Sequence, residues 1–355
     1  MDREHATHKQ DISPQTAKPP GNRAYLIRCL GFALGVLLIV LLLKQAGYRT
    51  VLQRLSYLSV IGLLSAYGAY SLGWLMRTAR LRLLTCSCGS SVPWLDLFLL
   101  RISAFALNNI LPSKLGDVAC VAFLRAKGLA VGRAFAILVH VRLMDLAALL
   151  AIAWLALFVD PVPLPGWLIV SILAGCLVVA IPLGVVLIKH RDFLPRMLQR
   201  LADRLGWPAA KLAAAKLTDA YLGFSAIARN HSLMGRSVLL SVAVWLCDIL
   251  TAWLILNDLA QPMPFIVVCA TVCIANIGKL LPLTPGGLGV YEGIFALVLS
   301  WYGVAFPLAL TCGIIDHLVK KSLNLGIGLP AALTSGYGMW RGRKTGALDV
   351  SRSLH

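Results

Sequence analysis

Long apolar stretches recur along this chain, and they constrain its fold more than any other feature. A helix that crosses a bilayer core needs about 20 consecutive apolar residues. Stretches of this kind occur near residues 24–43, 58–76, 134–159, 166–188, 236–256 and 307–333. Only 14% of the residues are charged and the mean hydropathy is +0.79, whereas soluble proteins contain about 25% charged residues. We therefore predict an all-α, polytopic membrane helix bundle.

Two further apolar regions, 94–124 and 264–303, are each interrupted by proline and glycine. Non-helical backbone survives at membrane depth only where protein or trapped water satisfies its polar groups. The flanks of the first region are basic and the outer flanks of the second are uncharged, so we expect the two regions to enter and return from opposite faces. The predicted fold has about six full spans and two inverted re-entrant helical hairpins that meet near the midplane.

The distribution of basic residues predicts the orientation of the chain. The formal net charge is +18, from 33 Lys and Arg against 15 Asp and Glu. Basic residues fill the segment 189–234 and follow the second span at Arg77, Arg80 and Arg82, whereas the loops 160–165 and 257–264 contain none. Cytoplasmic loops carry the excess of Lys and Arg. We expect a multi-pass protein of the cell inner (plasma) membrane with both termini cytoplasmic; the loop 44–57 is placed outside although it is basic.

The chain divides into one membrane domain and two tails. Residues 1–23 are polar and proline-bearing and predict a disordered cytoplasmic tail, residues 24–335 form the membrane domain, and residues 336–355 form a basic cytoplasmic tail. Because the basic residues lie mostly beside apolar spans, we expect contact with membrane lipids and not with nucleic acid. The sequence leaves monomer and homodimer open.

The segment 189–234 contains an amphipathic stretch, "FLPRMLQRLADRLGW". Its apolar residues recur at helical spacing, and Arg196, Arg200 and Arg204 repeat every four residues. A helix with an apolar face and a basic flank typically lies in the membrane interface. We predict such a helix here, with anionic lipid headgroups bound by the three arginines.

The second break has the sequence "LPLTPGGLGVYEG" and combines helix-breaking residues with one carboxylate. Its candidate site residues are Pro285, Gly286, Gly287, Gly289 and Glu292. Glycine permits backbone angles closed to other residues, and a helix beginning after Gly289 would present N–H groups that favour an anion such as a lipid phosphate. Glu292 has two interpretations: a carboxylate that stabilises the helix start, or a cavity group that contacts a cationic headgroup or carries a proton.

The first break, "LNNILPSKLGDV", shares the pattern Pro-x-x-Leu-Gly with the second. This weak internal repeat agrees with the opposed orientations expected from the loops, as in transporters with inverted repeats. Asp117 is interpreted either as an N-terminal cap or as a cavity contact, Lys114 offers a cation for phosphate, and the asparagines offer hydrogen bonds. The candidate residues are Asn108, Asn109, Pro112, Lys114, Gly116 and Asp117.

Two sets of charged residues lie inside predicted spans. Arg142 and Asp145 are three residues apart and Asp316 and Lys320 four apart, so that each set can pair on one helix face. Both sets are interpreted either as structural ion pairs or as the charged floor of a substrate cavity. His and Cys residues lack the spacing of a metal site, and we predict no metal, no cofactor and no catalytic residue.

The two motifs, in this order, resemble the transmembrane region of the lysylphosphatidylglycerol synthase family over about residues 24–335. The resemblance implies a stand-alone, flippase-like member without the soluble synthase domain. It also implies that the two breaks form paired re-entrant motifs. The residues that carry over are Asn109, Pro112, Gly116 and Asp117 in the first motif and Pro285, Gly286, Gly287, Gly289 and Glu292 in the second. The chain departs from the family pattern where Ser113-Lys114 replaces a glycine-containing pair and where Asp316-His317 replaces an arginine.

The expected function is translocation of a lipid or lipid-linked substrate between leaflets. Two alternatives stay open: a membrane-embedded transferase that uses a lipid-linked donor, with Asp117 as its candidate carboxylate, and an accessory scaffold of a lipid or glycan pathway. The sequence contains no nucleotide-binding or hydrolase motif that would favour another class of enzyme.

Overall fold

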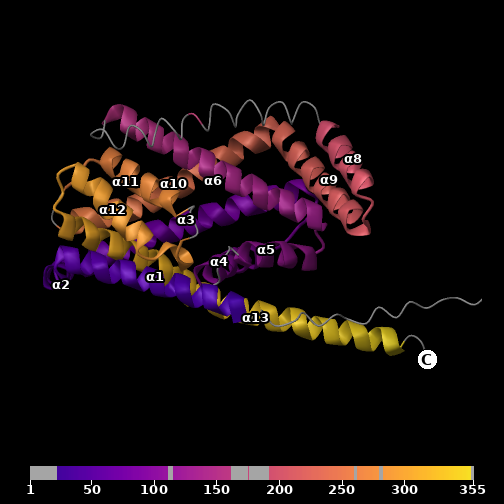
Figure 1. Ribbon diagram of the computed structural model, residues 1–355, viewed down its shortest axis with the longest axis horizontal. Coiled ribbons are helices and arrows are strands. Elements are labelled where there is room, and N and C mark those ends of the chain that lie inside the picture. Colours follow the sequence, from indigo (N-terminus) through magenta and orange to yellow (C-terminus); the bar gives the residue numbers. More distant parts are fainter. Residues whose placement is uncertain are drawn as a thin grey trace, which may run out of the picture.

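The computed structural model describes residues 22–110, 115–160, 175, 192–259, 262–279 and 283–352. In these ranges all regular secondary structure is helical and there is no strand (Figure 1), which confirms the all-α class. The predicted tail up to residue 21, the predicted span 166–188 apart from residue 175, Pro112 and Lys114 lie outside the described residues.

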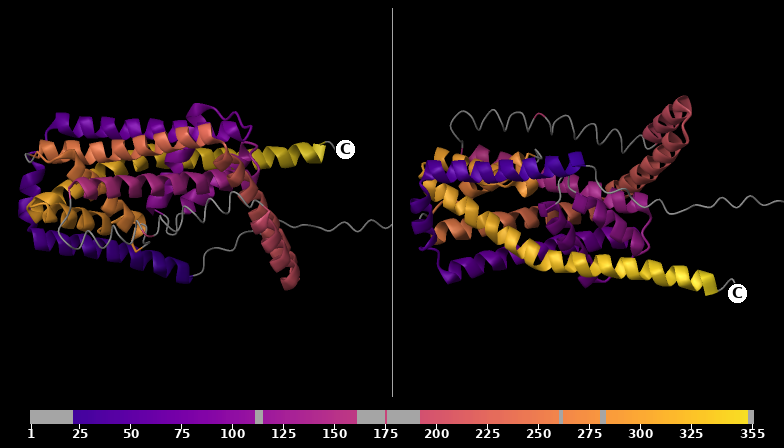
Figure 2. Two further views of the ribbon diagram at one scale, coloured as in Figure 1. Left: turned by 90° about the horizontal axis from the view of Figure 1, so that it is seen from above. Right: turned by 60° about the horizontal axis from the view of Figure 1, so that its bottom comes forward.

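Five long helices make up most of the bundle and run roughly along its long axis (Figures 1 and 2). They are α1 (Asn22–Ala46), α3 (Val60–Ser87), α6 (Val131–Val159), α10 (His231–Asp258) and α13 (Phe306–Arg352). By length and composition, α6 and α10 can each cross a membrane, and a bent pair formed by α1 and α2 is a third candidate. The prediction of about six spans goes beyond these helices and stays a prediction.

Helix α3 differs from the predicted span 58–76 because it continues for a further helical stretch to Ser87. Arg77 and Arg80, which were assigned to a cytoplasmic loop, lie inside this helix and are only 6% and 1% exposed. That assignment was wrong because carboxylates from α10 and α6 neutralise both guanidinium groups. These two arginines therefore do not mark a loop.

The loop predicted at residues 44–57 contains a short helix, α2 (Tyr48–Leu55). The chain bends by 88° between α1 and α2. Gly47 lies at the bend with φ 77, a backbone angle that glycine adopts without strain. Val51 of α2 is buried in the main hydrophobic cluster, and this contact fixes the short helix across the end of the bundle (Figure 1).

Each interrupted apolar region folds into a pair of short helices. The first pair is α4 (Trp94–Ile110) and α5 (Leu115–Ala126), and the second is α11 (Phe265–Gly278) and α12 (Val290–Trp301), with a 3-10 turn, η2 (Pro285–Gly287), between them. Every one of these helices is shorter than the roughly 20 residues that cross a bilayer. The two hairpins lie toward opposite ends of the bundle (Figure 1).

The two breaks lie in contact with each other. An ideal Cβ on Gly286 in η2 would lie 3.4 Å from the backbone oxygen of Asn109, near the end of α4. The expected meeting of the two breaks is therefore present in the structure. Their inverted symmetry and their depth in a membrane stay predictions.

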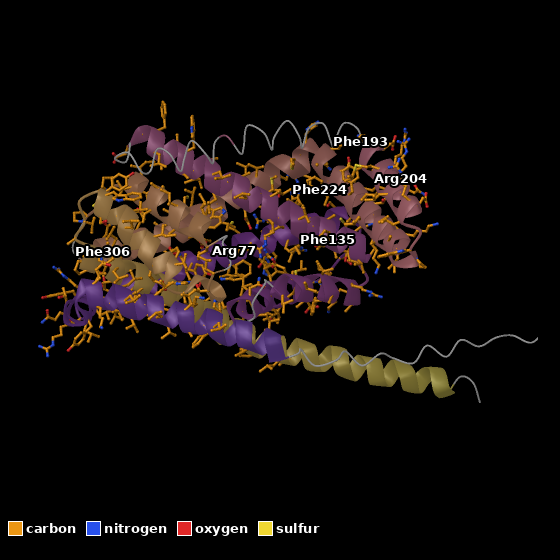
Figure 3. All side chains as sticks on the ribbon, viewed as in Figure 1. Arg77, Phe135, Phe193, Arg204, Phe224 and Phe306 are labelled. Atoms are coloured by element: carbon orange, nitrogen blue, oxygen red, sulfur yellow. The ribbon has the colours of Figure 1, made fainter. Side chains whose placement is uncertain are left out.

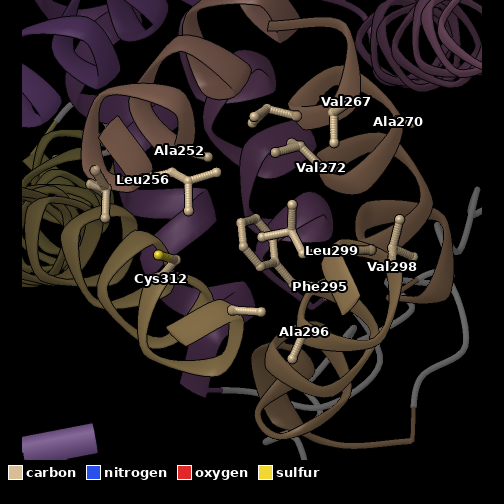
Figure 4. Packing of buried hydrophobic residues seen from close by; sticks show 14 of the residues in the cluster. Ala252, Leu256, Val267, Ala270, Val272, Phe295, Ala296, Val298, Leu299 and Cys312 are labelled. Atoms are coloured by element: carbon tan, nitrogen blue, oxygen red, sulfur yellow. The ribbon is translucent and has the colours of Figure 1, made fainter. Parts of the chain in front are cut away.

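The largest hydrophobic cluster holds the second hairpin in place (Figure 4). Phe295 and Leu299 of α12 and Val272 of α11 are fully buried, and they pack with Leu256 of α10 and Cys312 of α13. In a membrane such side chains stabilise the bundle through close van der Waals packing, because lipid is as apolar as the core. The N-terminal end of α12, where the polar site begins, is thus anchored by a well-packed core.

Helices α8 (Phe193–Leu205) and α9 (Pro208–Arg229) form a hairpin that projects from one end of the bundle (Figure 2). Helix α8 is the predicted amphipathic segment. Its apolar residues Phe193, Met197 and Leu201 are 45–59% exposed, in agreement with a face that needs a covering surface. Binding of this face to a membrane stays a prediction.

Candidate functional site

A charged cavity of about 450 Å³ lies where the two breaks meet. Side chains from both hairpins and from α3, α6, α10 and α13 line it. Figure 3 shows one of them, Arg77, in the middle of the bundle. Among the described residues, the lining includes five Lys and Arg side chains and three Asp side chains. They are Arg77, Arg142, Lys279, Lys320, Lys321, Asp117, Asp145 and Asp248.

Two of the carboxylates in the cavity wall are paired with arginines of α3. Arg77 donates to Asp248 at 2.6 Å, and Arg80 donates to Asp145 at 2.5 Å and to Ser241 at 2.6 Å. A buried ion pair contributes little net stability because desolvation of both charges offsets their attraction. Removal of one partner is nevertheless costly, so these pairs fix α3 against α6 and α10.

The third carboxylate joins the first break to α6. Asp117 lies in the first turn of α5, where Arg142 donates to its two oxygens at 2.6 Å and 2.7 Å. Asn108 adds a hydrogen bond from its Nδ2 at 3.1 Å. Bidentate arginine–carboxylate contacts are among the stronger polar interactions. The carboxylate therefore has cationic and amide partners from two other segments of the chain.

The predicted pairing of Arg142 with Asp145 on one helix face is wrong. Arg142 contacts Asp117 of α5, and Asp145 contacts Arg80 of α3. The helical spacing permits an intrahelical pair, but a partner on a neighbouring helix is available to each side chain. The two residues thus act as links between helices. In contrast, the predicted pair Asp316–Lys320 is present at 2.8 Å.

The glycines of the second break provide space for two lysine side chains. Gly286 and Gly287 have φ values of 60 and 75, which L-residues with a side chain rarely adopt. A Cβ on Gly286 would lie 2.0 Å from the Nζ atom of Lys321, and one on Gly287 would lie 2.7 Å from the Cδ atom of Lys279. Each glycine therefore permits the backbone turn and also leaves room for a lysine side chain.

These two lysines differ from the other cations of the cavity. Lys321 donates to Asn109 Oδ1 at 3.2 Å, and the ammonium group of Lys279 lies 4.2 Å from the ring centroid of Tyr291. Throughout the described ranges, neither has a carboxylate within ion-pair distance. Sequence reasoning missed both residues. Their sequence positions could have identified them, because Lys279 comes shortly before the second break and Lys321 adjoins Lys320.

Glu292 is a buried carboxylate at the start of α12 and is 3% exposed. Gly289, whose φ is 77, precedes the helix, and its N–H donates to Glu292 Oε2 at 2.8 Å. His317 Nδ1 lies 2.6 Å from the other carboxylate oxygen. The role of Glu292 at the helix start is therefore present in the structure. Its role toward a substrate stays a prediction.

A second, apolar cavity of about 330 Å³ adjoins the charged one. Its lining is largely aliphatic and comes from α1, α2, α12 and α13. His317 and Lys321 line both cavities, and Glu292 lines only the apolar one. Two ionisable side chains, His317 and Lys321, thus border both the charged and the apolar space.

The remaining predicted site residues take part in helix packing, in the turn of the second break or in hydrogen bonds between helices. Gly116 allows α4 and α5 to approach, since a Cβ there would lie 2.0 Å from the carbonyl oxygen of Ala104. Pro285 begins η2, and Tyr291 donates to Asp316 Oδ2 at 2.6 Å. Within the described residues, no three His, Cys, Asp or Glu side chains gather as metal ligands.

Comparison with known proteins agrees with this architecture. The sequence profile described as "Lysylphosphatidylglycerol synthase TM region" matches residues 28–328. The chain belongs to this family. A UPF0104 membrane protein of Methanothermobacter thermautotrophicus is 22% identical over 275 residues, which cover 72% of this chain and 79% of that protein.

A second relative of this family member carries an enzyme name. "Glycosyltransferase AglD" of Haloferax volcanii is 30% identical over 129 residues, which amount to 35% of this chain. The match spans about a fifth of the length of that relative, 21%. We therefore attribute the activity in this name to the Haloferax volcanii protein.

Proposed function

We propose that this member of the family moves a lipid or lipid-linked substrate between the leaflets of the membrane through the charged cavity. The observation that carries the proposal is that a charged cavity and an apolar cavity lie on either side of the same two residues, His317 and Lys321. An amphipathic molecule can place its headgroup in the first and part of its apolar chain against the second.

The physical argument concerns the cost of moving a headgroup through hydrocarbon. A charged side chain at the bilayer centre costs at least about 2.5–3.5 kcal/mol on insertion scales, and a lipid headgroup meets a similar barrier. Short helices that meet from opposite ends, as in many transporters, leave a polar site between them. A cavity with fixed, oriented charges replaces the lost hydration and lowers this barrier. The pathway as proposed equilibrates the leaflets without an energy source of its own.

The test is a leaflet assay in liposomes that contain the purified protein and fluorescent phospholipids with anionic, zwitterionic or cationic headgroups. Dithionite quenches the lipids of the outer leaflet, so scrambling raises the quenched fraction above that of protein-free vesicles. Gly286→Val, which places a side chain where the two breaks meet, is expected to abolish scrambling. Gly68→Val is the matched control, because a Cβ on Gly68 of α3 meets nothing within 4 Å.

Absence of scrambling by the unmodified protein for every lipid offered would contradict the proposal for those lipids. Equal scrambling by the Gly286→Val and Gly68→Val variants would contradict the assignment of the pathway to this cavity. Size-exclusion profiles of both variants show whether each is folded, so that loss of activity can be separated from loss of protein.

A second candidate function is supported by the similarity to the protein named as a glycosyltransferase. In this case the chain would transfer a group from a lipid-linked donor inside the membrane. Its candidate carboxylate, Asp117, is held by Arg142 and Asn108, which disfavours a role as a free base. Incubation with a lipid-linked sugar followed by mass spectrometry separates the two proposals, since only the enzyme yields a new product.

A further inference from the structure

We propose that Lys279 and Lys321 form the recognition site for a doubly charged phosphate group on the substrate lipid. This inference rests on the proposed function, because it names the chemical class of the headgroup that enters the charged cavity. The two side chains come from the C-terminal end of α11 and from the middle of α13, and they are seated on the adjacent glycines 287 and 286.

The charge of the cavity is the first argument. Three of its cations have carboxylate partners: Arg77 with Asp248, Arg142 with Asp117, and Lys320 with Asp316. The third lining carboxylate, Asp145, is paired with Arg80. Lys279 and Lys321 are left without an acidic partner among the described residues, although each is partly exposed to the cavity. Unpaired charges inside a membrane are expensive and indicate a functional site.

The nearby carboxylate Glu292 acts on Lys321 through space but forms no ion pair with either lysine. Its two oxygens are engaged by the Gly289 N–H and by His317 Nδ1, and it lines the apolar cavity and not the charged one. Asp316 is engaged by Lys320 and by the Tyr291 hydroxyl. Among the described residues, neither lysine therefore has a directly bound carboxylate, and a ligand anion can take that place.

The arrangement of hydrogen-bond donors is the second argument. The Nδ2 atom of Asn109 and the Nη1 atom of Arg77 are buried and have no partner among the described residues, and both residues line the cavity. One acceptor, Asp248 Oδ1, is also unpaired, but its carboxylate is neutralised by Arg77. Buried polar atoms are normally satisfied. An anion with several acceptor oxygens would give both lysines a partner beside these donors, whereas a cationic headgroup would meet like charge.

The choice of phosphate follows from the number of charges. A phosphate monoester carries about −1.5 to −2 charges at neutral pH and three acceptor oxygens, which matches two ammonium groups. A phosphodiester carries a single charge and is expected to bind less tightly. We therefore expect the site to bind a lipid that ends in a phosphate monoester or a pyrophosphate more tightly than one with a diester or an aminoacylated headgroup.

The experiment measures lipid binding to the full-length protein by native mass spectrometry, so that no transport is needed for the readout. The probes are phosphatidic acid, phosphatidylglycerol and diacylglycerol with identical acyl chains, and inorganic phosphate alone. The variant is Lys279→Gln with Lys321→Gln. The control is Lys211→Gln with Lys216→Gln, which removes the same charge from two exposed positions on α9. The single variant Lys321→Gln serves if the double variant is not monodisperse.

The expected order of affinity is phosphatidic acid, then phosphatidylglycerol, then diacylglycerol. Hydrogen bonds to charged groups contribute enough that each lysine should account for about a tenfold change in affinity. The double variant should therefore bind phosphatidic acid about a hundredfold more weakly, with no change in the control. Equal binding of phosphatidic acid and diacylglycerol, or full binding by the double variant, would overturn the proposal. Inorganic phosphate that binds as tightly as phosphatidic acid would overturn the assignment to a lipid.

These outcomes are separable from those of the leaflet assay. Phosphate-dependent binding together with an absence of scrambling would support the lysine site and contradict translocation. Scrambling without any phosphate preference in binding would support translocation and contradict the lysine site. A lysine pair that serves only to hold the glycine turn would leave lipid binding unchanged and lower thermal stability, which is the structural alternative.

Discussion

The two helix breaks share a sequence pattern, yet the structure uses them differently. Near the first break, Asp117 is neutralised by Arg142 and tied to α4 by Asn108. At the second break, the first-turn carboxylate is Glu292, two positions later in the pattern than Asp117, and it receives its hydrogen bonds from a backbone N–H and from His317. The glycines beside it seat two lysines that lack acidic partners within the described residues.

This difference shows how a repeated local pattern acquires two roles. Proline and glycine determine where a helix stops, and the acid that follows stabilises the next helix start. The partners of that acid come from distant parts of the chain. We interpret the first break as a structural joint between α4, α5 and α6, and the second as the side of the cavity that meets a ligand.

The largest expected effect on stability is at the first break. Gly116→Ala would place a Cβ 2.0 Å from the carbonyl oxygen of Ala104, and backbone cannot move aside as a side chain can. Overpacking of this kind costs about 1–3 kcal/mol, and we expect the upper end of that range. Gly286→Ala should cost about 1–2 kcal/mol for its left-handed backbone, because the Lys321 ammonium group can move away. Thermal unfolding in detergent measures which variant loses more stability. A larger loss for Gly286→Ala than for Gly116→Ala would contradict the comparison of the two breaks.

The carboxylates themselves provide the next test. Asp117→Asn leaves Arg142 without its carboxylate, and since Arg142 is partly exposed to the cavity we expect a loss of about 2 kcal/mol, below the 3–5 kcal/mol of a fully buried pair. Glu292→Gln keeps an oxygen for the Gly289 N–H and should cost about 1 kcal/mol or less.

A double-mutant cycle of Asp117→Asn with Arg142→Gln checks this prediction. The double variant should be more stable than Asp117→Asn alone, since no unpaired guanidinium group remains. Additive losses would show that the two side chains do not depend on each other.

Local features of the sequence predicted part of this site. The positions of both breaks, the helix start after Gly289, the first-turn location of Glu292 and the pair Asp316–Lys320 all depend on residues within a few positions of one another. Such patterns can be read from sequence because proline, glycine and helical spacing act locally.

The rest of the site depends on contacts between distant segments. Arg77 and Asp248 are 171 residues apart, and no local pattern connects them. Arg77 and Arg80 were assigned to a loop because an arginine after an apolar stretch normally marks its cytoplasmic end. Lys279 was not recognised for a similar reason, since its seat on Gly287 exists only once α11 and η2 are folded together.

A smaller effect is expected at Tyr291, whose hydroxyl and ring have separate partners. Tyr291→Phe removes the hydrogen bond to Asp316 and should cost about 1 kcal/mol, but it keeps the ring beneath the Lys279 ammonium group. Tyr291→Leu also removes the cation–π contact. We expect phosphatidic acid binding to survive in the first variant and to weaken several-fold in the second. Equal binding by both would show that the ring does not position Lys279.

The smallest effect on transport is expected far from both breaks, on α8. Replacement of Arg196, Arg200 and Arg204 by Gln should leave scrambling within about twofold of the unmodified protein, because these residues project from the bundle and the predicted lipid contact would act only through screened surface charge. Hydrogen exchange of α8 in nanodiscs should show protection by anionic lipids that the variant loses. Equal exchange in anionic and zwitterionic nanodiscs would contradict the interfacial interpretation of α8.

The central claim is that a lipid enters the charged cavity between the two breaks, and photo-crosslinking tests it most directly. A benzophenone amino acid at Leu146, which lines the cavity on α6, is compared with one at Leu155, which lies on the same helix, does not line the cavity and is 54% exposed. We predict that Leu146 adducts are enriched in phosphate-bearing lipids and disappear when Lys279 and Lys321 are replaced by Gln, whereas Leu155 adducts match the bulk membrane. Adducts at Leu146 that are absent, or that have the bulk composition in both backgrounds, would contradict the account.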